Sequence, residues 1–173
     1  MSFFWNKCKN VLPEESGRVA SRPFGAAYYR ALVAVEDEEH CVHTYEAVRI
    51  HRIKTGVYST DLSMKKGDEN WHWEYVGPPG TVLAWTWLPD ENDAGWIRDK
   101  MPEETEGVKT SKACGIEGVA VLALAQMAAY PSAGPKAHIK NRYRLYRGDK
   151  VSDWAWSCPD SILAWMPLPR FKA

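Results

Sequence analysis

The chain has 173 residues, which is enough for one ordinary domain or for two small ones. Its 22 Lys and Arg residues balance its 22 Asp and Glu residues, and 45% of the residues are hydrophobic. This composition excludes a wholly disordered chain and disfavours a general DNA-coating protein or an acidic mimic of DNA. The chain also has an excess of aromatic residues, with nine Trp, eight Tyr and four Phe.

The first half of the chain predicts an opening segment followed by four strands. The segment begins at Trp5 and includes Leu12-Pro13-Glu14-Glu15 and Gly17. The strand signals are a run rich in Val, Leu and Tyr, an alternation of apolar with basic residues, a Trp-x-Trp pair and a Val-Leu-Ala-Trp segment. The strands lie, in chain order, at residues 27–35, 48–53, 71–73 and 82–85, and Thr55-Gly56 is a predicted turn.

The second half repeats this order of elements. An opening segment runs from Trp96 through Met101-Pro102-Glu103-Glu104 to Gly107. Strands are predicted at residues 119–125, 138–146, 154–156 and 162–165, with a turn at Arg147-Gly148-Asp149. The helix propensity of Ala also permits a helix over residues 119–130, but the repeat favours a strand because the corresponding segment of the first half is rich in Tyr and Val.

We therefore interpret the two halves as copies of one unit, at residues 1–92 and 93–173. Matched positions are 89 residues apart for Pro13 and Pro102 and 80 apart for Trp85 and Trp165, so the copies differ by loop-sized deletions. The first unit has 10 basic and 13 acidic residues, net −3, and the second has 12 and 9, net +3. The neutral total therefore hides a dipolar chain.

These patterns predict a mainly β protein, or an α+β protein with few helices. A four-stranded unit of roughly 80 residues is near the lower limit for an independent core. We therefore expect two tandem small antiparallel β units that are packed together with pseudo-two-fold symmetry, or a single sandwich or barrel built from both copies. Either arrangement places a groove between the repeats.

The most basic segment of the chain lies in the second unit. Lys140, Arg142 and Arg144 share one face of a predicted strand, interleaved with Tyr143 and followed by Arg147. A row of cations beside Tyr suits phosphate, an acidic protein surface or nucleic acid, and a solvated outer strand is the structural alternative. We predict these five residues as the partner-binding residues.

The tryptophans of the closing strands are the most distinctive set. They can stack on a base or a sugar, but recurrence in both copies favours a structural role as aromatic pairs in the core of a small sheet. We predict as structural aromatic residues Trp71, Trp73, Trp85, Trp87, Trp154, Trp156 and Trp165.

Other candidate sites are weaker. His40-Cys41-Val42-His43 offers soft ligands but no fourth ligand at a suitable spacing, so we expect no metal. Glu14-Glu15 and Glu103-Glu104 follow Pro in opening turns, where exposed carboxylates are ordinary. The sequence has no nucleophile elbow, phosphate-binding Gly loop or dinucleotide fingerprint, and its four widely spaced cysteines form no C-x-x-C pair.

The repeated motifs resemble a known family. A Trp, a Leu-Pro-Glu-Glu step with Gly, a following Val/Leu strand and a terminal strand ending in Trp-Met-Pro-Leu-Pro are similar to the small module catalogued as domain of unknown function 551, found largely in phages and prophages. The second copy carries the resemblance, through Trp96, Pro102, Glu103, Gly107 and residues 162–169. In the first copy, Trp87-Leu88-Pro89 lacks the Met-Pro step. The resemblance implies a phage-type protein and no particular reaction.

From the residues and this resemblance we predict a small, non-enzymatic phage-type accessory protein that binds a host protein or ribonucleoprotein complex and inhibits host defence, as anti-CRISPR proteins do. The alternative is a sponge that sequesters a nucleotide or cyclic-nucleotide immune signal in the inter-repeat groove. A hydrolase or transferase with a site made by distant residues is a third class. We expect no cofactor. We also expect no membrane contact, because no segment approaches the roughly 20 apolar residues needed to cross a bilayer. The predicted location is the cytoplasm, that of the host cell if the protein is phage-encoded.

Overall fold

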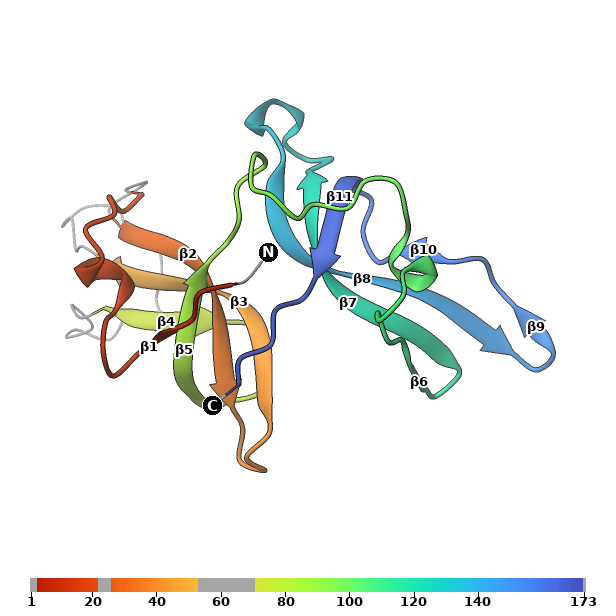
Figure 1. Cartoon of the computed structure of the whole chain (residues 1–173), viewed down its shortest axis with the longest axis horizontal. Helices are drawn as coiled ribbons and strands as arrows, with labels where there is room; N and C mark the ends of the chain where they lie inside the picture. Colours follow the sequence, from red (N-terminus) through yellow and green to blue (C-terminus); the bar gives the residue numbers. More distant parts are fainter. Residues whose placement is uncertain (1–2, 22–25, 53–70, 173) are drawn as a thin grey trace. The chain divides into compact units, whose positions relative to one another are not determined.

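The computed structural model describes residues 3–21, 26–52 and 71–172 and divides into two compact units (Figure 1). The first unit extends to Trp87 and includes the C-terminal residues from Arg170, and the second is Leu88–Pro169. All helical elements in the described ranges are short 3-10 turns, and the strands form two antiparallel sheets, one in each unit. The prediction of a mainly β protein with two antiparallel sheets is therefore confirmed.

The first unit is a five-stranded sheet, with a 3-10 turn, η1 (Pro13–Glu15), between its first and second strands in the chain. Its strand order is β1 (Asn6–Lys7), β5 (Thr81–Trp87), β2 (Ala26–Glu36), β3 (Val42–Arg52) and β4 (His72–Tyr75). β2 and β3 pair along their whole length and form the centre of the unit. The predicted turn at Thr55-Gly56, and Ile53 of the predicted second strand, lie outside the described residues.

The second unit repeats the order of the last four of these strands, as β11 (Ser161–Pro167), β7 (Ile116–Gln126), β8 (Lys136–Arg147) and β10 (Ala155–Trp156). Two further short strands flank it, because β6 (Ser111–Ala113) pairs with β7 and β9 (Lys150–Val151) pairs with β8. The 3-10 turns are η2 (Pro102–Glu104) and η3 (Pro131–Ala133). The strand predicted over residues 119–125 is observed, and the helical alternative is wrong.

The two sheets also share their register. Val33 of β2 lies opposite Trp85 of β5, and Ala123 of β7 lies opposite Trp165 of β11. The pairing skips one residue at the same place in each closing strand, so that Leu83 and Leu163 are the bulged positions. Asn6 also pairs with Trp85, as Ile97 pairs with Trp165. The repeat inferred from the tryptophans is thus a repeat of topology and of pairing.

Each unit has its own hydrophobic cluster around its buried tryptophan. In the first unit, Trp85 packs with Ala31, Val33, Val35 and Ala47; in the second, Trp165 packs with Val121 and Ala123. The alternation of these residues along β2 and β7 directs them to one face of the sheet. That same face carries the polar side chains described next.

Candidate functional site

The first polar feature that the units share is an arginine paired with a glutamate of the opening 3-10 turn. Arg49 Nη2 and Nε donate to the two carboxylate oxygens of Glu14 at 2.8 and 3.2 Å. Arg142 Nε lies 3.0 and 2.9 Å from the two oxygens of Glu103. All four side chains are less than a fifth exposed, so these pairs hold each opening segment on its sheet.

Each of these arginines also lies over a tryptophan of the neighbouring strand. Arg49 Cζ is 5.5 Å from the ring centroid of Trp73, and Arg142 Cζ is 5.3 Å from that of Trp156. The residues are direct cross-strand partners, Arg49 with Trp73 and Arg142 with Trp156. The guanidinium therefore lies beside both a carboxylate and an aromatic ring.

The most buried tryptophans anchor the opening segments. Trp85 is 1% exposed and Trp165 is 2% exposed. The Nε1–H of Trp85 donates to the carbonyl of Val11 at 2.9 Å, and that of Trp165 donates to the carbonyl of Lys100 at 2.6 Å. Both residues therefore belong to the core, with the indole N–H satisfied by the backbone.

The remaining predicted structural tryptophans are half-buried and already contact other side chains. Trp71 lies against Tyr29 and His51, each with ring centroids 5.4 Å apart. Trp87 lies 4.7 Å from Trp85 in an edge-to-face arrangement, and Arg144 lies 5.0 Å above Trp154. A base that stacked on one of these rings would have to compete with these intramolecular contacts.

The predicted basic row does lie on one face of β8, but its charges are paired within the unit. Lys140 Nζ is 2.8 Å from Asp160, and Arg144 Nη2 is 2.8 Å from Glu117. Together with the pairing of Arg142, this gives each of the three cations a carboxylate partner from another element. The row is therefore close to neutral and has a stabilising role in the fold.

Glu117 is the centre of the most extensive of these networks. It accepts hydrogen bonds from the hydroxyl groups of Tyr146 at 2.6 Å and Thr110 at 2.8 Å, and from Arg144 Nε at 2.9 Å. These bonds, that of Tyr146 above all, lower the pKa of Glu117 from 4.5 to about 2, and the carboxylate in turn raises the pKa of Tyr146. Lys112 Nζ covers the ring of Tyr146 at 3.4 Å from its centroid.

Asp160 has a similar role beside Lys140. Its second carboxylate oxygen accepts the backbone N–H of Ala128 at 3.1 Å. The hydrogen bond from Lys140, followed by that from Ala128, lowers the pKa of Asp160. The carboxylate therefore joins β8 to the turn after β7.

The other two predicted partner-binding residues lie on the opposite face of β8. Tyr143 lies opposite Gly118 of β7, and Arg147 lies opposite Lys150 of β9. A Cβ at position 118 would be 3.3 Å from the Cβ of Tyr143, so the glycine permits close approach of the two strands. Arg147 is exposed, and no ion pair involving it occurs within the described part of the chain.

These two residues belong to an arm at the end of the second sheet. We define the arm as β6, β9 and the flanked parts of β7 and β8, residues 111–118 and 143–151 (Figure 1). Its exposed residues include Ile116, 48% exposed, and Lys150. Sequence analysis missed Ile116 because it started the strand at Val119, and it did not select Leu145 or Lys150 because the pairing of β8 with β7 and β9 has no local sequence signal.

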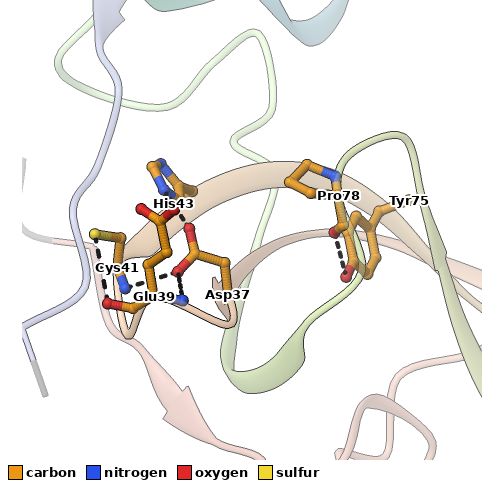
Figure 2. Close-up of polar contacts among 6 residues, drawn as sticks. All are labelled: Asp37, Glu39, Cys41, His43, Tyr75 and Pro78. Atoms are coloured by element: carbon orange, nitrogen blue, oxygen red, sulfur yellow. Dashed lines mark hydrogen bonds and ion pairs between the residues drawn. The ribbon is translucent and has the colours of Figure 1, made fainter.

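In the first unit, the turn between β2 and β3 contains the segment considered for metal binding (Figure 2). One Asp37 oxygen accepts the backbone N–H groups of Glu39 and Cys41 at 3.0 and 2.9 Å, and the other lies 3.1 Å from His43 Nε2. These bonds, with that of Cys41 the largest cause, lower the pKa of Asp37. Asp37 thus closes the hairpin, and His40 adopts the left-handed conformation within it, with φ 60°.

The paired glutamates also have local structural roles. The Glu15 carboxylate accepts the backbone N–H of Leu12 at 2.7 Å, and that of Glu104 accepts the N–H of Met101 at 3.2 Å. In each pair the first glutamate binds an arginine and the second caps the 3-10 turn. Within the described ranges, no three His, Cys, Asp or Glu side chains are placed to hold a metal ion.

Comparison of the chain with protein-family models, curated proteins and solved structures found no match. The resemblance to domain of unknown function 551 therefore stays a prediction. Among the described residues, no helix has the length and apolar character needed to cross a membrane.

Proposed function

We propose that the protein is a non-enzymatic binding protein that recognises a macromolecular partner through the arm of its second unit. The observation that carries this proposal is the contrast between the faces of the arm. The Glu117 network pairs the polar groups of one face with each other, while Ile116, Arg147 and Lys150 are exposed on the other. Exposed apolar and cationic side chains on a braced sheet support binding.

The partner class follows from the resemblance of the repeated motifs to a phage module. A phage-type protein of this kind would act on a host protein or ribonucleoprotein complex and would inhibit host defence, as anti-CRISPR proteins do. The dipolar charge, net −3 on the first predicted unit and net +3 on the second, supports recognition of a charged macromolecular surface.

A plaque assay tests the proposal. Cells that carry a CRISPR–Cas system or another defence system directed against a test phage are grown with and without the protein, and cells without the system serve as the control. We expect plaque numbers to rise on at least one defended strain and to stay the same on the control strain. Unchanged plaque numbers on every defended strain, with no host protein or nucleic acid copurifying, would contradict the proposal.

The nucleotide-sequestering alternative has less support. It requires tryptophan faces for bases and arginines for phosphates, but Arg49 and Arg142 are bound to glutamates and lie over Trp73 and Trp156. Thermal stabilisation by a member of a nucleotide panel would favour this alternative over a macromolecular partner.

A further inference from the structure

Strand pairing assigns the residues of the arm to two faces. Residues directly opposite each other in an antiparallel pair project to the same side of the sheet. The pairs Ile116 with Leu145, Gly118 with Tyr143, and Arg147 with Lys150 define one side, which we call the Ile116 face. The pairs Lys112 with Glu117, Glu117 with Arg144, and Tyr146 with Val151 define the other, the Glu117 face.

The hydrogen-bonding groups of the Glu117 face pair with one another, while Val151 at its edge is 48% exposed. Glu117 accepts from Thr110, Arg144 and Tyr146, and Lys112 covers the tyrosine ring. These contacts join β6, β7 and β8 and brace the arm from one side. A braced arm loses little conformational entropy when its other face binds a partner.

The Ile116 face has a different chemistry. Ile116 is 48% exposed and Leu145 and Tyr143 are half-buried, which gives an apolar strip across β7 and β8. Arg147 and Lys150 lie exposed at its end, and within the described residues neither forms an ion pair or a side-chain hydrogen bond. Lys140, Arg142 and Arg144 face the other way and each has a carboxylate partner, whereas Arg147 and Lys150 are the cations that this face of the arm offers to an anion.

This combination fits a protein better than a nucleic acid. Nucleic-acid binding depends on many phosphate contacts, commonly about 6–10, whereas this face provides two cations and Asp149 lies in the turn between them. Aliphatic side chains with charges at the rim are typical of protein interfaces. The complementary surface would place apolar side chains over Ile116 and Leu145 and carboxylates beside Arg147 and Lys150.

From this geometry we infer that the Ile116 face is the contact surface for an acidic, partly apolar segment of a partner protein. This inference rests on the proposed binding function and names its surface and the chemistry of its partner.

The probe is a terminally blocked peptide of sequence Glu-Leu-Glu-Ile-Asp, titrated into the isotopically labelled full chain while backbone amide NMR shifts are followed. We expect salt-sensitive shifts at Ile116, Leu145, Arg147 and Lys150. The variant Arg147→Glu/Lys150→Glu and the separate variant Ile116→Asp should each lower the affinity for the peptide by about tenfold or more. The matched charge variant Lys9→Glu/Lys136→Glu should bind like the native chain, because both lysines are exposed and lie outside the arm.

Absence of shifts, shifts centred outside the Ile116 face, or equal weakening by both charge variants would overturn the inference. So would stronger binding of oligothymidylate than of the peptide at the same residues. Spectra of each variant report whether it is folded, and Arg147→Glu/Lys150→Glu changes only exposed side chains. If the arm variants keep plaque-assay activity, the arm is not the binding surface, and only the proposed inhibition of host defence stands. If the native chain binds the peptide but never protects phage, the proposed inhibition of host defence fails instead.

Discussion

Arg142 and Glu103 are joined across the second unit by contacts of 3.0 and 2.9 Å from one Nε atom to both carboxylate oxygens, with each side chain 12% exposed. Replacing Arg142→Gln would leave the glutamate charge without its partner in a place that water reaches poorly. We expect the free energy of unfolding to fall by about 1–3 kcal/mol. Urea denaturation followed by tryptophan fluorescence measures this loss.

The matched control is Arg147→Gln, the same chemical change at an exposed position of the same strand. We expect its effect to lie within about 0.5 kcal/mol of zero. Equal effects of the two substitutions would show that the Arg142–Glu103 pair does not stabilise the unit. Arg49→Gln should reproduce the loss of Arg142→Gln, because Arg49 has the equivalent partner in Glu14.

The sequence predicted the fold well where a pattern is local. Alternating apolar residues marked the strands, and the spacing of Trp85 and Trp165 revealed the repeat that the register later matched. The extension of β7 back to Ile116 was missed because Glu117 and Gly118 are poor strand formers. Their pairing with Arg144 and Tyr143 of β8 makes them a strand, and this tertiary contact leaves no local signal.

The pairing of charges was beyond sequence analysis for a similar reason. The sequence predicts a turn at Glu103 and a basic strand at Arg142, but the two residues are 39 positions apart. Arg144 and Glu117 are 27 apart. Side-chain periodicity shows which residues share a face of one element, and it cannot show which carboxylate from another element lies over that face. The basic row was therefore expected to be more positive than it is.

The Glu117 network predicts an acid-sensitive contribution to stability. The pKa of Glu117 is lowered from 4.5 to about 2 in the folded chain, chiefly by the hydrogen bond from Tyr146. A carboxyl group whose pKa is lower in the folded chain than in the unfolded chain stabilises the fold at pH values above the unfolded-state pKa. This stabilisation is lost as the pH falls, here between about 4.5 and 2. We expect the Glu117→Gln variant to have a lower melting temperature than the native chain at pH 7. Below pH 3 the two melting temperatures should approach each other.

Scanning calorimetry across this pH range, with side-chain carboxyl NMR to assign the titration, checks the prediction. Glu106→Gln is the control, because Glu106 is exposed and has no resolved interaction among the described residues. A constant difference in melting temperature between the native chain and Glu117→Gln at all pH values would contradict the assignment.

The cysteines should divide into two reactivity classes. Cys41 and Cys114 are exposed, whereas Cys8 and Cys158 are half-buried, and all four thiols are free. Burial raises the pKa of the Cys8 thiol, although Arg49 opposes this, so less of the reactive thiolate forms there. We expect an aromatic disulfide reagent to modify Cys41 and Cys114 rapidly and the other two slowly. A fast phase that survived in Cys41→Ser/Cys114→Ser would contradict this order.

The buried indole of Trp165 should be among the most sensitive positions of the second unit. It is 2% exposed, packs with Val121 and Ala123, and donates to the carbonyl of Lys100 at 2.6 Å. Trp165→Ala removes the packing and the hydrogen bond together, and we expect it to lower the free energy of unfolding by about 3–5 kcal/mol. Trp165→Phe keeps most of the apolar contact but leaves the carbonyl of Lys100 without its donor, with an expected loss of about 1–3 kcal/mol.

Trp154→Ala is the comparison, since Trp154 is half-buried and contacts Arg144 at 5.0 Å. The free energy of unfolding should fall less in Trp154→Ala than in Trp165→Ala, because solvent already reaches the Trp154 ring and a cation–π contact at such a site contributes only about 0.5–1 kcal/mol. Urea denaturation monitored by far-ultraviolet circular dichroism is the suitable measurement, because these substitutions alter the fluorescence signal itself. Similar losses for Trp165→Ala and Trp154→Ala would mean that the packing of Trp165 and its hydrogen bond to the opening segment together contribute little to the stability of the unit.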